Sequence, residues 1–172
     1  MNPMQKVRIE KLTLNIGCGK DTARLDKGII LIKTLTGIEP IKTVTSKRIP
    51  SWGLRPGLPI GVKLTLRKKP AKDILSKLLS AKDNALKISQ FDSAGNISFG
   101  IQEYIDIPGI AYNPDIGIIG LEVCVTLEKP GFRIKRRRLK RKKIPRKHLV
   151  SKQEALDFMK NEFNIKIVEE SA

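Results

Sequence analysis

The chain of 172 residues has 40% hydrophobic residues and carries 34 Lys and Arg against 17 Asp and Glu. These values fit one compact domain with or without a tail, and no apolar run approaches the roughly 18 residues of a membrane span. The formal net charge of +17 predicts a polyanionic partner, because binding to phosphates releases condensed counterions. Nucleic acid is the main candidate, and an acidic membrane surface is the alternative.

The first third of the chain predicts two strands around a helix. Polar and apolar residues alternate over 11–16, which indicates a half-buried strand. A glycine turn follows, and helical spacing predicts a helix over 21–36 that ends at Gly37. A weaker strand is predicted over 41–47, and prolines and glycines predict a loop over 49–59. The apolar residues expected on the core face of the helix are Leu25, Ile29, Ile32 and Leu35.

The middle of the chain predicts further strands and one helix. Alternation is clearest over 60–67, and a helix is expected from Pro70 to about Lys87. Strands are predicted over 97–107 and 121–127, with turn residues between them. This order favours an α+β fold, in which a mostly antiparallel sheet has helices packed on one face and a polar, free second face. The apolar stripe of the predicted helix is Ile74, Leu75, Leu78, Leu79 and Leu86.

The C-terminal part, residues 131–172, is predicted to be a basic extension and a short helix beside a core domain of residues 1–130. Eleven of the 15 residues between Arg133 and Lys147 are basic and none is acidic, so we expect disorder or an extended path without a partner. A nuclear-localisation signal, a calmodulin-binding or membrane-binding patch and an RNA-threading tail all share this composition. The block lacks amphipathic spacing, which disfavours a membrane helix. Ser151 and Glu154 match a capping box, which predicts a helix to about Phe163. The basic residues expected to bind a polyanion, with RNA as the main candidate, are Arg133, Lys135, Arg136, Arg137, Arg138, Lys140, Arg141, Lys142, Lys143, Arg146 and Lys147.

Residues suited to catalysis are sparse. His148, the only histidine, has no Cys or carboxylate at metal or triad spacing, and we interpret it as solvated or facing a phosphate. The turn from Gly17 to Lys20 lacks the spacing of a dinucleotide loop or a P-loop. It is read as a tight turn, as a nucleotide loop, or as a place where backbone N–H groups and Lys20 hold an RNA phosphate. We therefore expect no enzyme, no cofactor and no metal, and we read Cys18 and Cys124 as reduced thiols.

Two surfaces are candidates for binding RNA. The polar sides of 11–16 and 60–67 form one cationic surface if the two strands are neighbours, and such a surface can contact phosphates and 2′-OH groups. The alternative is an ordinary solvated sheet face. The loop after residue 48 holds the only tryptophan, Trp52, with Arg48 and Arg55. An exposed loop of this kind can contact folded RNA, whereas Trp52 can also fold inward as a core plug.

Four strings in fixed order carry a family resemblance: LTLNIGCGK, TLTGIEPIKTVTSKR, SWGLRPGLPIGVKLTLR and FDSAGNISFGIQEYIDIPGIAYNPDIGIIGLEV. Together they resemble the ribosomal protein five family of the large subunit, over about residues 3–128. The basic extension with KHLVSKQEA is similar to the archaeal and eukaryotic branch of that family.

The resemblance implies a structural protein of the cytoplasmic ribosome that binds 5S ribosomal RNA in the central protuberance. It also implies contacts with large-subunit ribosomal RNA, with neighbouring ribosomal proteins, with transfer RNA in the peptidyl site, and with a small-subunit protein across the intersubunit bridge as a further candidate. Asn15 and Thr65 match residues that contact 5S RNA in the family, while Ile38 stands where bacterial relatives often have glutamine. The residues expected to bind 5S RNA are Lys11, Thr13, Asn15, Lys20, Lys63, Thr65 and Arg67. The residues expected to contact transfer RNA are Ser51, Trp52, Gly53, Leu54, Arg55, Pro56 and Gly57.

Two other hypotheses use only part of this pattern. A nonspecific nucleic-acid-coating or chromatin protein needs only the positive charge, and it would bind DNA and RNA of matched length equally. An enzyme that holds a nucleotide at the turn from Gly17 to Lys20 would be stabilised selectively by nucleotides.

Overall fold

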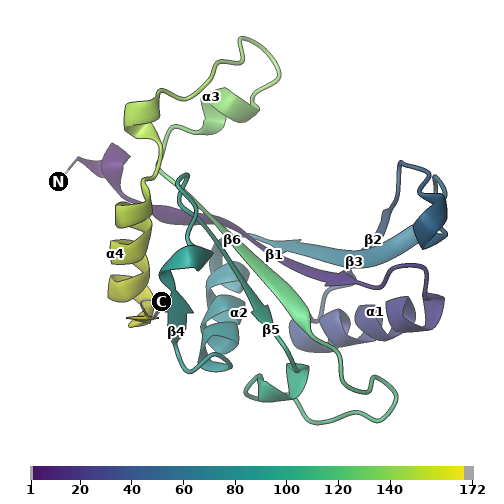
Figure 1. Cartoon of the computed structure of the whole chain (residues 1–172). Helices are drawn as coiled ribbons and strands as arrows, with labels where there is room; N and C mark the ends of the chain where they lie inside the picture. The colour runs from purple at the N-terminus through teal and green to yellow at the C-terminus, as the bar shows by residue number, and fades with distance from the viewer. Residues whose placement is uncertain (1, 169–172) are drawn as a thin grey trace.

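An antiparallel sheet of five strands, in the order β2-β3-β1-β6-β5, organises the computed structural model, which describes residues 2–168. Its strands are β1 (Arg8–Gly17), β2 (Ile41–Val44), β3 (Pro59–Leu66), β5 (Asn96–Ile101) and β6 (Leu121–Glu128). Two helices, α1 (Thr22–Thr36) and α2 (Lys68–Ser80), lie against one face of the sheet (Figure 1). The predicted α+β class, with helices on one face of a mostly antiparallel sheet, is confirmed.

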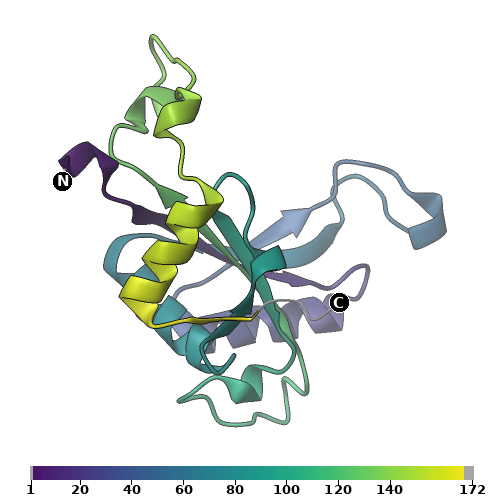
Figure 2. The same ribbon diagram turned by 60° about the vertical axis from the view of Figure 1, so that its left-hand side comes forward.

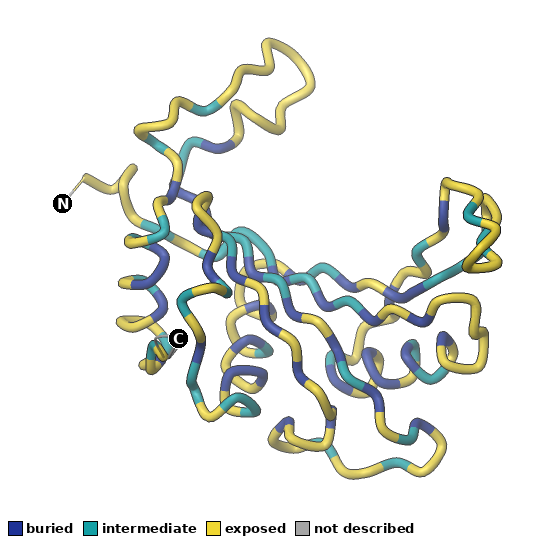
Figure 3. The backbone as a smooth tube through the Cα atoms, viewed as in Figure 1, coloured by how far each residue is buried: buried dark blue, intermediate teal, exposed yellow. Residues whose placement is uncertain are grey.

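Strand alternation sets which face is buried. Leu12, Leu14 and Ile16 of β1 are almost fully buried under the helices, and the apolar residues of β3, β5 and β6 follow the same alternation (Figure 3). The polar residues between them point to the opposite side, because successive side chains of a strand alternate. We call that side the outer face.

Helix α1 forms where its capping residues predict. The Asp21 carboxylate accepts hydrogen bonds from the N–H groups of Ala23 and Arg24 at 2.9 and 3.3 Å, and Gly37 ends the helix with a left-handed φ of 70°. Three of the four predicted core residues are buried, whereas Ile29 is only partly so. The buried positions that the prediction missed are Gly28 and Leu31.

The prediction of one helix from Pro70 to Lys87 is wrong at both ends. Helix α2 starts two residues earlier and ends at Ser80, because Asp83 and Asn84 adopt left-handed φ values of 54° and 52° that no helix continues. The next residues form β4 (Ala85–Lys87), which pairs in parallel with β7 (Lys166–Val168). Leu86 is therefore buried from a strand and not from the end of a helix.

Two predicted strands are shorter than expected. The strand predicted over 97–107 ends at Ile101, and the chain turns so that Tyr104 is fully buried with its hydroxyl accepting a 2.9 Å hydrogen bond from the N–H of Asn113. The strand predicted over 41–47 ends at Val44, because the Thr45 hydroxyl bonds to the backbone of Lys47. Short 3₁₀ turns complete the fold at Pro3–Gln5, Pro50–Trp52, Ile88–Gln90, Tyr104–Asp106 and Arg146–His148.

The predicted C-terminal helix is α4 (Lys152–Phe163), and its capping box is confirmed by reciprocal bonds between Ser151 and Glu154. Its buried residues Ala155, Leu156 and Met159 join the same hydrophobic cluster as the sheet. The division of the chain near residue 130 stays a prediction.

The basic segment follows a defined path away from the sheet. It begins as α3 (Arg133–Arg136), continues without regular structure over 137–145, and returns to α4 (Figure 2). The N–H of Lys142 donates to the carbonyl of Ile134 at 3.3 Å, so the outgoing and returning parts touch. We call residues 130–149 the basic arm.

Candidate RNA-binding surfaces

The two strands whose polar sides were predicted to form one surface are neighbours in the sheet. Thr13 of β1 lies opposite Thr65 of β3, and Asn15 lies opposite Lys63. Strand β6 extends the same polar rows on the other side of β1, and β5 lies beyond it. On β1, β3, β5 and β6 the outer face is therefore a continuous surface that consists mainly of hydroxyl, amide and amino groups, with one carboxylate and one thiol. Its residues are Lys11, Thr13, Asn15, Lys63, Thr65, Asn96, Ser98, Glu122, Cys124 and Thr126.

The residues of β5 and β6 on this face were not predicted from the sequence, and Glu122 is the charged one among them. It lies opposite Asn15, and the Asn15 side-chain amide donates a hydrogen bond to its carboxylate at 3.2 Å. This bond orients the amide so that the carbonyl oxygen Oδ1 of Asn15 is presented as an acceptor. The alternation of 121–127 already placed Glu122 on the polar side of its strand, but only the register brings it to Asn15.

A hollow of about 740 Å³ lies between the outer face and the basic arm. The side chains that line it come from both regions, and four of them are cationic. The cationic side chains are Lys11 from β1 and Lys135, Arg136 and Arg141 from the arm. The structure thus brings one predicted sheet-face residue and three predicted arm residues to a common concave surface.

Lys20 lies away from the rows of the outer face, whereas Arg67 continues the row of Lys63 and Thr65 just past the end of β3, with extended backbone. Arg67 is at the N-cap position of α2 and is exposed. The aliphatic part of Lys20 lies beside Gly53, 3.7 Å from where a Cβ atom would stand on that residue. Lys20 therefore accompanies the loop between β2 and β3 and not the sheet face.

The first backbone donors of the glycine turn are used within the protein. The N–H groups of Cys18 and Gly19 both donate to the carbonyl of Ile60, at 2.9 and 3.0 Å. The start of α1 is already occupied by the Asp21 carboxylate, which accepts from the first helical N–H groups and repels a second anion. The tight turn is therefore confirmed, and the readings of it as a nucleotide loop or as a phosphate site with Lys20 stay predictions.

The loop between β2 and β3 projects on the same side as the basic arm, away from α1 and α2 (Figure 1). Its tip is tied by two backbone bonds between Ile49 and Leu54, both 3.0 Å long. Gly53 and Gly57 provide left-handed φ values of 67° and 83° at its turns. Trp52 is 67% exposed, so the interpretation of this side chain as a core plug is wrong.

His148 is held by the protein itself. Its Nε2 atom lies 2.7 Å from the carbonyl oxygen of Pro130, and its ring lies 6.0 Å from that of Phe132. The ring is half-buried, so it is not freely solvated, and a contact between His148 and a phosphate stays a prediction. Within residues 2–168, no group of three His, Cys, Asp or Glu side chains is placed to hold a metal ion. No described helix has the length and apolar character needed to cross a bilayer.

Both cysteines are free thiols. Burial raises the pKa of the Cys18 thiol. The pKa of Cys124 is also raised, first by burial and then by the negative charge of Glu122 beside it on the outer face. Both thiols therefore stay protonated more readily than a free cysteine does.

Known proteins match this chain along nearly its whole length. The family model described as Ribosomal protein L5 matches residues 2–55, and the model of the C-terminus of the same ribosomal family matches residues 59–158. The large ribosomal subunit protein uL5 of Sulfurisphaera tokodaii is 50% identical over 170 residues, which cover 98% of this chain and 96% of the relative. The uL5 protein of Nanoarchaeum equitans is 50% identical, with 97% and 99% covered, and that of Methanosphaera stadtmanae is 48% identical with the same coverage.

These relatives confirm the resemblance carried by the four sequence motifs, including its archaeal type. The match includes the arm and α4 as well as the sheet, because it covers nearly all of the chain. The chain belongs to the ribosomal protein L5 family and is a structural constituent of the large ribosomal subunit.

Proposed function

We propose that this protein is a non-catalytic RNA-binding protein that binds 5S ribosomal RNA in the central protuberance through its outer face. The observation that carries the proposal is the register that joins Lys11, Thr13 and Asn15 with Lys63 and Thr65 on one open sheet face. Membership of a large-subunit protein family makes ribosomal RNA the polyanion that the charge of +17 requires.

The chemistry of this face suits the backbone of a structured RNA. The hydroxyl groups of Thr13 and Thr65 can each donate to and accept from a 2′-OH, and Oδ1 of Asn15 offers a further acceptor. Lys11 and Lys63 supply charge for phosphates. No Phe, Tyr or Trp stands in the rows of this face, so recognition rests on RNA shape and sugar contacts and not on stacked bases.

The other two predicted surfaces have separate partners in this proposal. The tip of the loop between β2 and β3, with Trp52 and Arg55 exposed, contacts transfer RNA in the peptidyl site. Lys20 beside Gly53 adds a charge to that loop. The basic arm contacts large-subunit ribosomal RNA. Neighbouring proteins of the central protuberance, and a small-subunit protein across the intersubunit bridge, are the proposed protein partners.

Single substitutions on the outer face test the proposal. Asn15→Ala and Thr65→Ala should each weaken binding to 5S RNA about fivefold to tenfold, because each removes a hydrogen bond to RNA. The melting temperature should change little, since both side chains lie on the open face. Thr34→Ala is the matched control, because Thr34 is exposed on α1, away from the outer face.

Two outcomes would contradict this function. A large fall in melting temperature for Asn15→Ala or Thr65→Ala, with unchanged affinity of the folded fraction, would make these residues structural. Equal binding of the wild type to 5S RNA, to another RNA and to DNA of matched length would favour the nonspecific coating protein instead.

A further inference from the structure

Two charged residues at the end of β6 are buried, and they are consecutive in the sequence. Glu128 and Lys129 are each 4% exposed, and they are the only charged residues of the described chain, 2–168, in the buried class. Burying a charge is unfavourable unless the charge is paired, so each should have a specific partner. Their partners lie on the basic arm, whose outgoing leg begins with α3 and whose returning leg leads to α4.

Glu128 holds the outgoing leg. Its carboxylate pairs with Arg8 of β1 at 2.8 Å and with Arg136, the last residue of α3. Arg136 also pairs with the carboxylate of Glu10 at 3.1 Å. The guanidinium of Arg136 is therefore fixed by two acidic residues of the sheet, and α3 is placed at the rim of the hollow beside the outer face.

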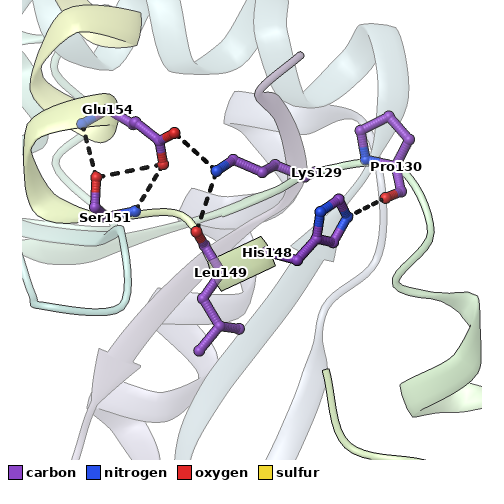
Figure 4. A network of polar contacts seen from close by, with 6 residues as sticks. All are labelled: Lys129, Pro130, His148, Leu149, Ser151 and Glu154. Carbon is purple, nitrogen blue, oxygen red and sulfur yellow. Dashed lines mark hydrogen bonds and ion pairs between the residues drawn. The ribbon is translucent and has the colours of Figure 1, made fainter. Parts of the chain in front are cut away.

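Lys129 holds the returning leg (Figure 4). Its Nζ atom donates to the carbonyl of Leu149 at 3.2 Å and to the carboxylate of Glu154 at 2.7 Å. Glu154 is also the capping-box residue of α4, since it accepts from the N–H of Ser151 at 3.0 Å. One carboxylate therefore joins the end of β6, the end of the arm and the start of α4.

Two further contacts close the base of the arm. The ring of His148 donates to the carbonyl of Pro130, so the first and last parts of the arm touch directly. Val150 packs so closely on the turn at Gly95 that a Cβ atom there would lie 2.7 Å from Val150 Cγ1. The arm is thus a closed loop with both ends anchored, although 11 of its residues are cationic.

Stability alone does not account for this arrangement. Replacing a buried ion pair with apolar residues of similar size is often neutral or stabilising, so such pairs contribute geometry more than net free energy. The geometry here places Lys135 and Arg141 over the outer face, where they line the hollow with Lys11. A loop of like charges without these anchors would extend into solvent.

We propose that Glu128 and Lys129 are positioning residues that fix the two legs of the basic arm. The arm and the outer face then form one preorganised binding surface for the backbone phosphates of a folded RNA. The identity of that RNA rests on the proposed function. The positioning itself is a property of the free protein and can be measured without RNA. Preorganisation raises affinity because less conformational entropy is lost on binding.

Glu154→Gln is the sharpest test, because glutamine serves equally well in a capping box. The variant keeps α4 capped and removes only the charge that pairs with Lys129. Glu162→Gln is the matched control, because Glu162 lies on α4 as Glu154 does. It forms a 2.5 Å ion pair with Lys72 of α2, and both of these side chains are largely exposed. Hydrogen exchange of the amides of Lys142, His148 and Leu149, which donate within the arm, measures its opening. These amides should exchange at least tenfold faster in Glu154→Gln and at the wild-type rate in Glu162→Gln.

Binding to 5S RNA gives the second readout. Glu154→Gln should weaken binding about fivefold to tenfold, while the dependence of affinity on salt stays unchanged because every cation of the arm remains. Arg141→Ala should instead lower the salt slope by about one, as loss of a phosphate contact does. The expected pattern for a positioning role of Glu154 is therefore a lower affinity for 5S RNA with an unchanged salt dependence.

Wild-type exchange rates in Glu154→Gln would overturn the proposal, and so would faster exchange with unchanged affinity. If Glu154→Gln lowers the melting temperature more than Glu162→Gln does, Glu128→Gln tests the outgoing leg with the same two readouts. A wild-type protein without preference for 5S RNA would refute the proposed function, whereas the exchange rates of the arm would still decide the positioning.

Discussion

The outer face and the basic arm offer RNA two different kinds of surface. The outer face takes its geometry from strand register, which fixes Thr13 against Thr65 and Asn15 against Lys63 whatever the charge around them. The arm has almost no regular structure over 137–145, and its geometry depends on a few ion pairs and hydrogen bonds at its base. Hydrogen-bonding groups at fixed spacing select among RNAs, whereas clustered cations bind any phosphate. We therefore propose that the sheet provides the selectivity for 5S RNA and that the arm provides most of the affinity.

Replacing residues 133–147 with a short Gly-Ser linker should have the largest effect on this comparison. The loss of 11 cations should lower affinity for 5S RNA by at least about 100-fold at moderate salt and flatten the salt dependence. The ratio of affinities for 5S RNA and a competitor RNA of equal length should stay nearly constant. Titrations with both RNAs at several salt concentrations measure this, and a collapse of the ratio would move selectivity into the arm.

Glu122→Gln should raise the affinity for RNA and lower the preference for 5S RNA. Removal of a negative charge from the outer face should raise affinity for both RNAs about twofold to threefold. The Asn15 amide would lose its charged acceptor, so the preference for 5S RNA should fall. Cys124→Ser on the same strand keeps the charge and serves as the control. An unchanged preference would mean that the bond from Asn15 to Glu122 does not orient the amide for RNA.

The smallest effect expected is on the pH dependence of stability. Burial by itself raises the pKa of Glu154, but hydrogen bonds from Lys129 and Ser151 outweigh it and hold the pKa below its ordinary value of 4.5. A lowered pKa means that the carboxylate stabilises the folded state fully above that value and loses this contribution as the pH falls through the folded-state pKa.

Urea unfolding of the wild type and of Glu154→Gln should therefore differ by no more than about 1 kcal/mol at pH 7. The difference should shrink as the pH is lowered below 4.5. A difference that grows on acidification would contradict the lowered pKa.

The sequence predicted the outer face well because alternation is a local signal. The polar sides of 11–16 and 60–67 follow directly from the order of residues, and so does the capping box of α4. The end of α2 was misjudged because Leu86 keeps helical spacing, while Asp83 and Asn84 break the helix for reasons of backbone conformation. Helix propensity alone does not show whether the helix continues to Leu86 or ends before Asp83.

The anchoring of the arm could not be predicted, because its partners are far apart in the sequence. Arg136 of the arm pairs with Glu10 of β1, at the other end of the chain, as well as with its near neighbour Glu128, and Lys129 and Glu154 are separated by 25 residues. From composition, the block of 11 basic residues indicates only a disordered or extended segment. The fixed path of the arm depends on Glu128 and Lys129, whose burial is a property of the folded sheet. Glu122 was missed for the same reason, since only strand register places it opposite Asn15.

The most direct test of the central claim is a titration of the wild-type protein with 5S ribosomal RNA and a competitor RNA of equal length across a series of salt concentrations. Affinity for both RNAs should fall steeply as salt rises, while the preference for 5S RNA persists, because register-fixed hydrogen bonds are not screened as phosphate contacts are. Equal affinity for both RNAs at every salt concentration, with both curves falling together, would contradict the assignment of selectivity to the outer face.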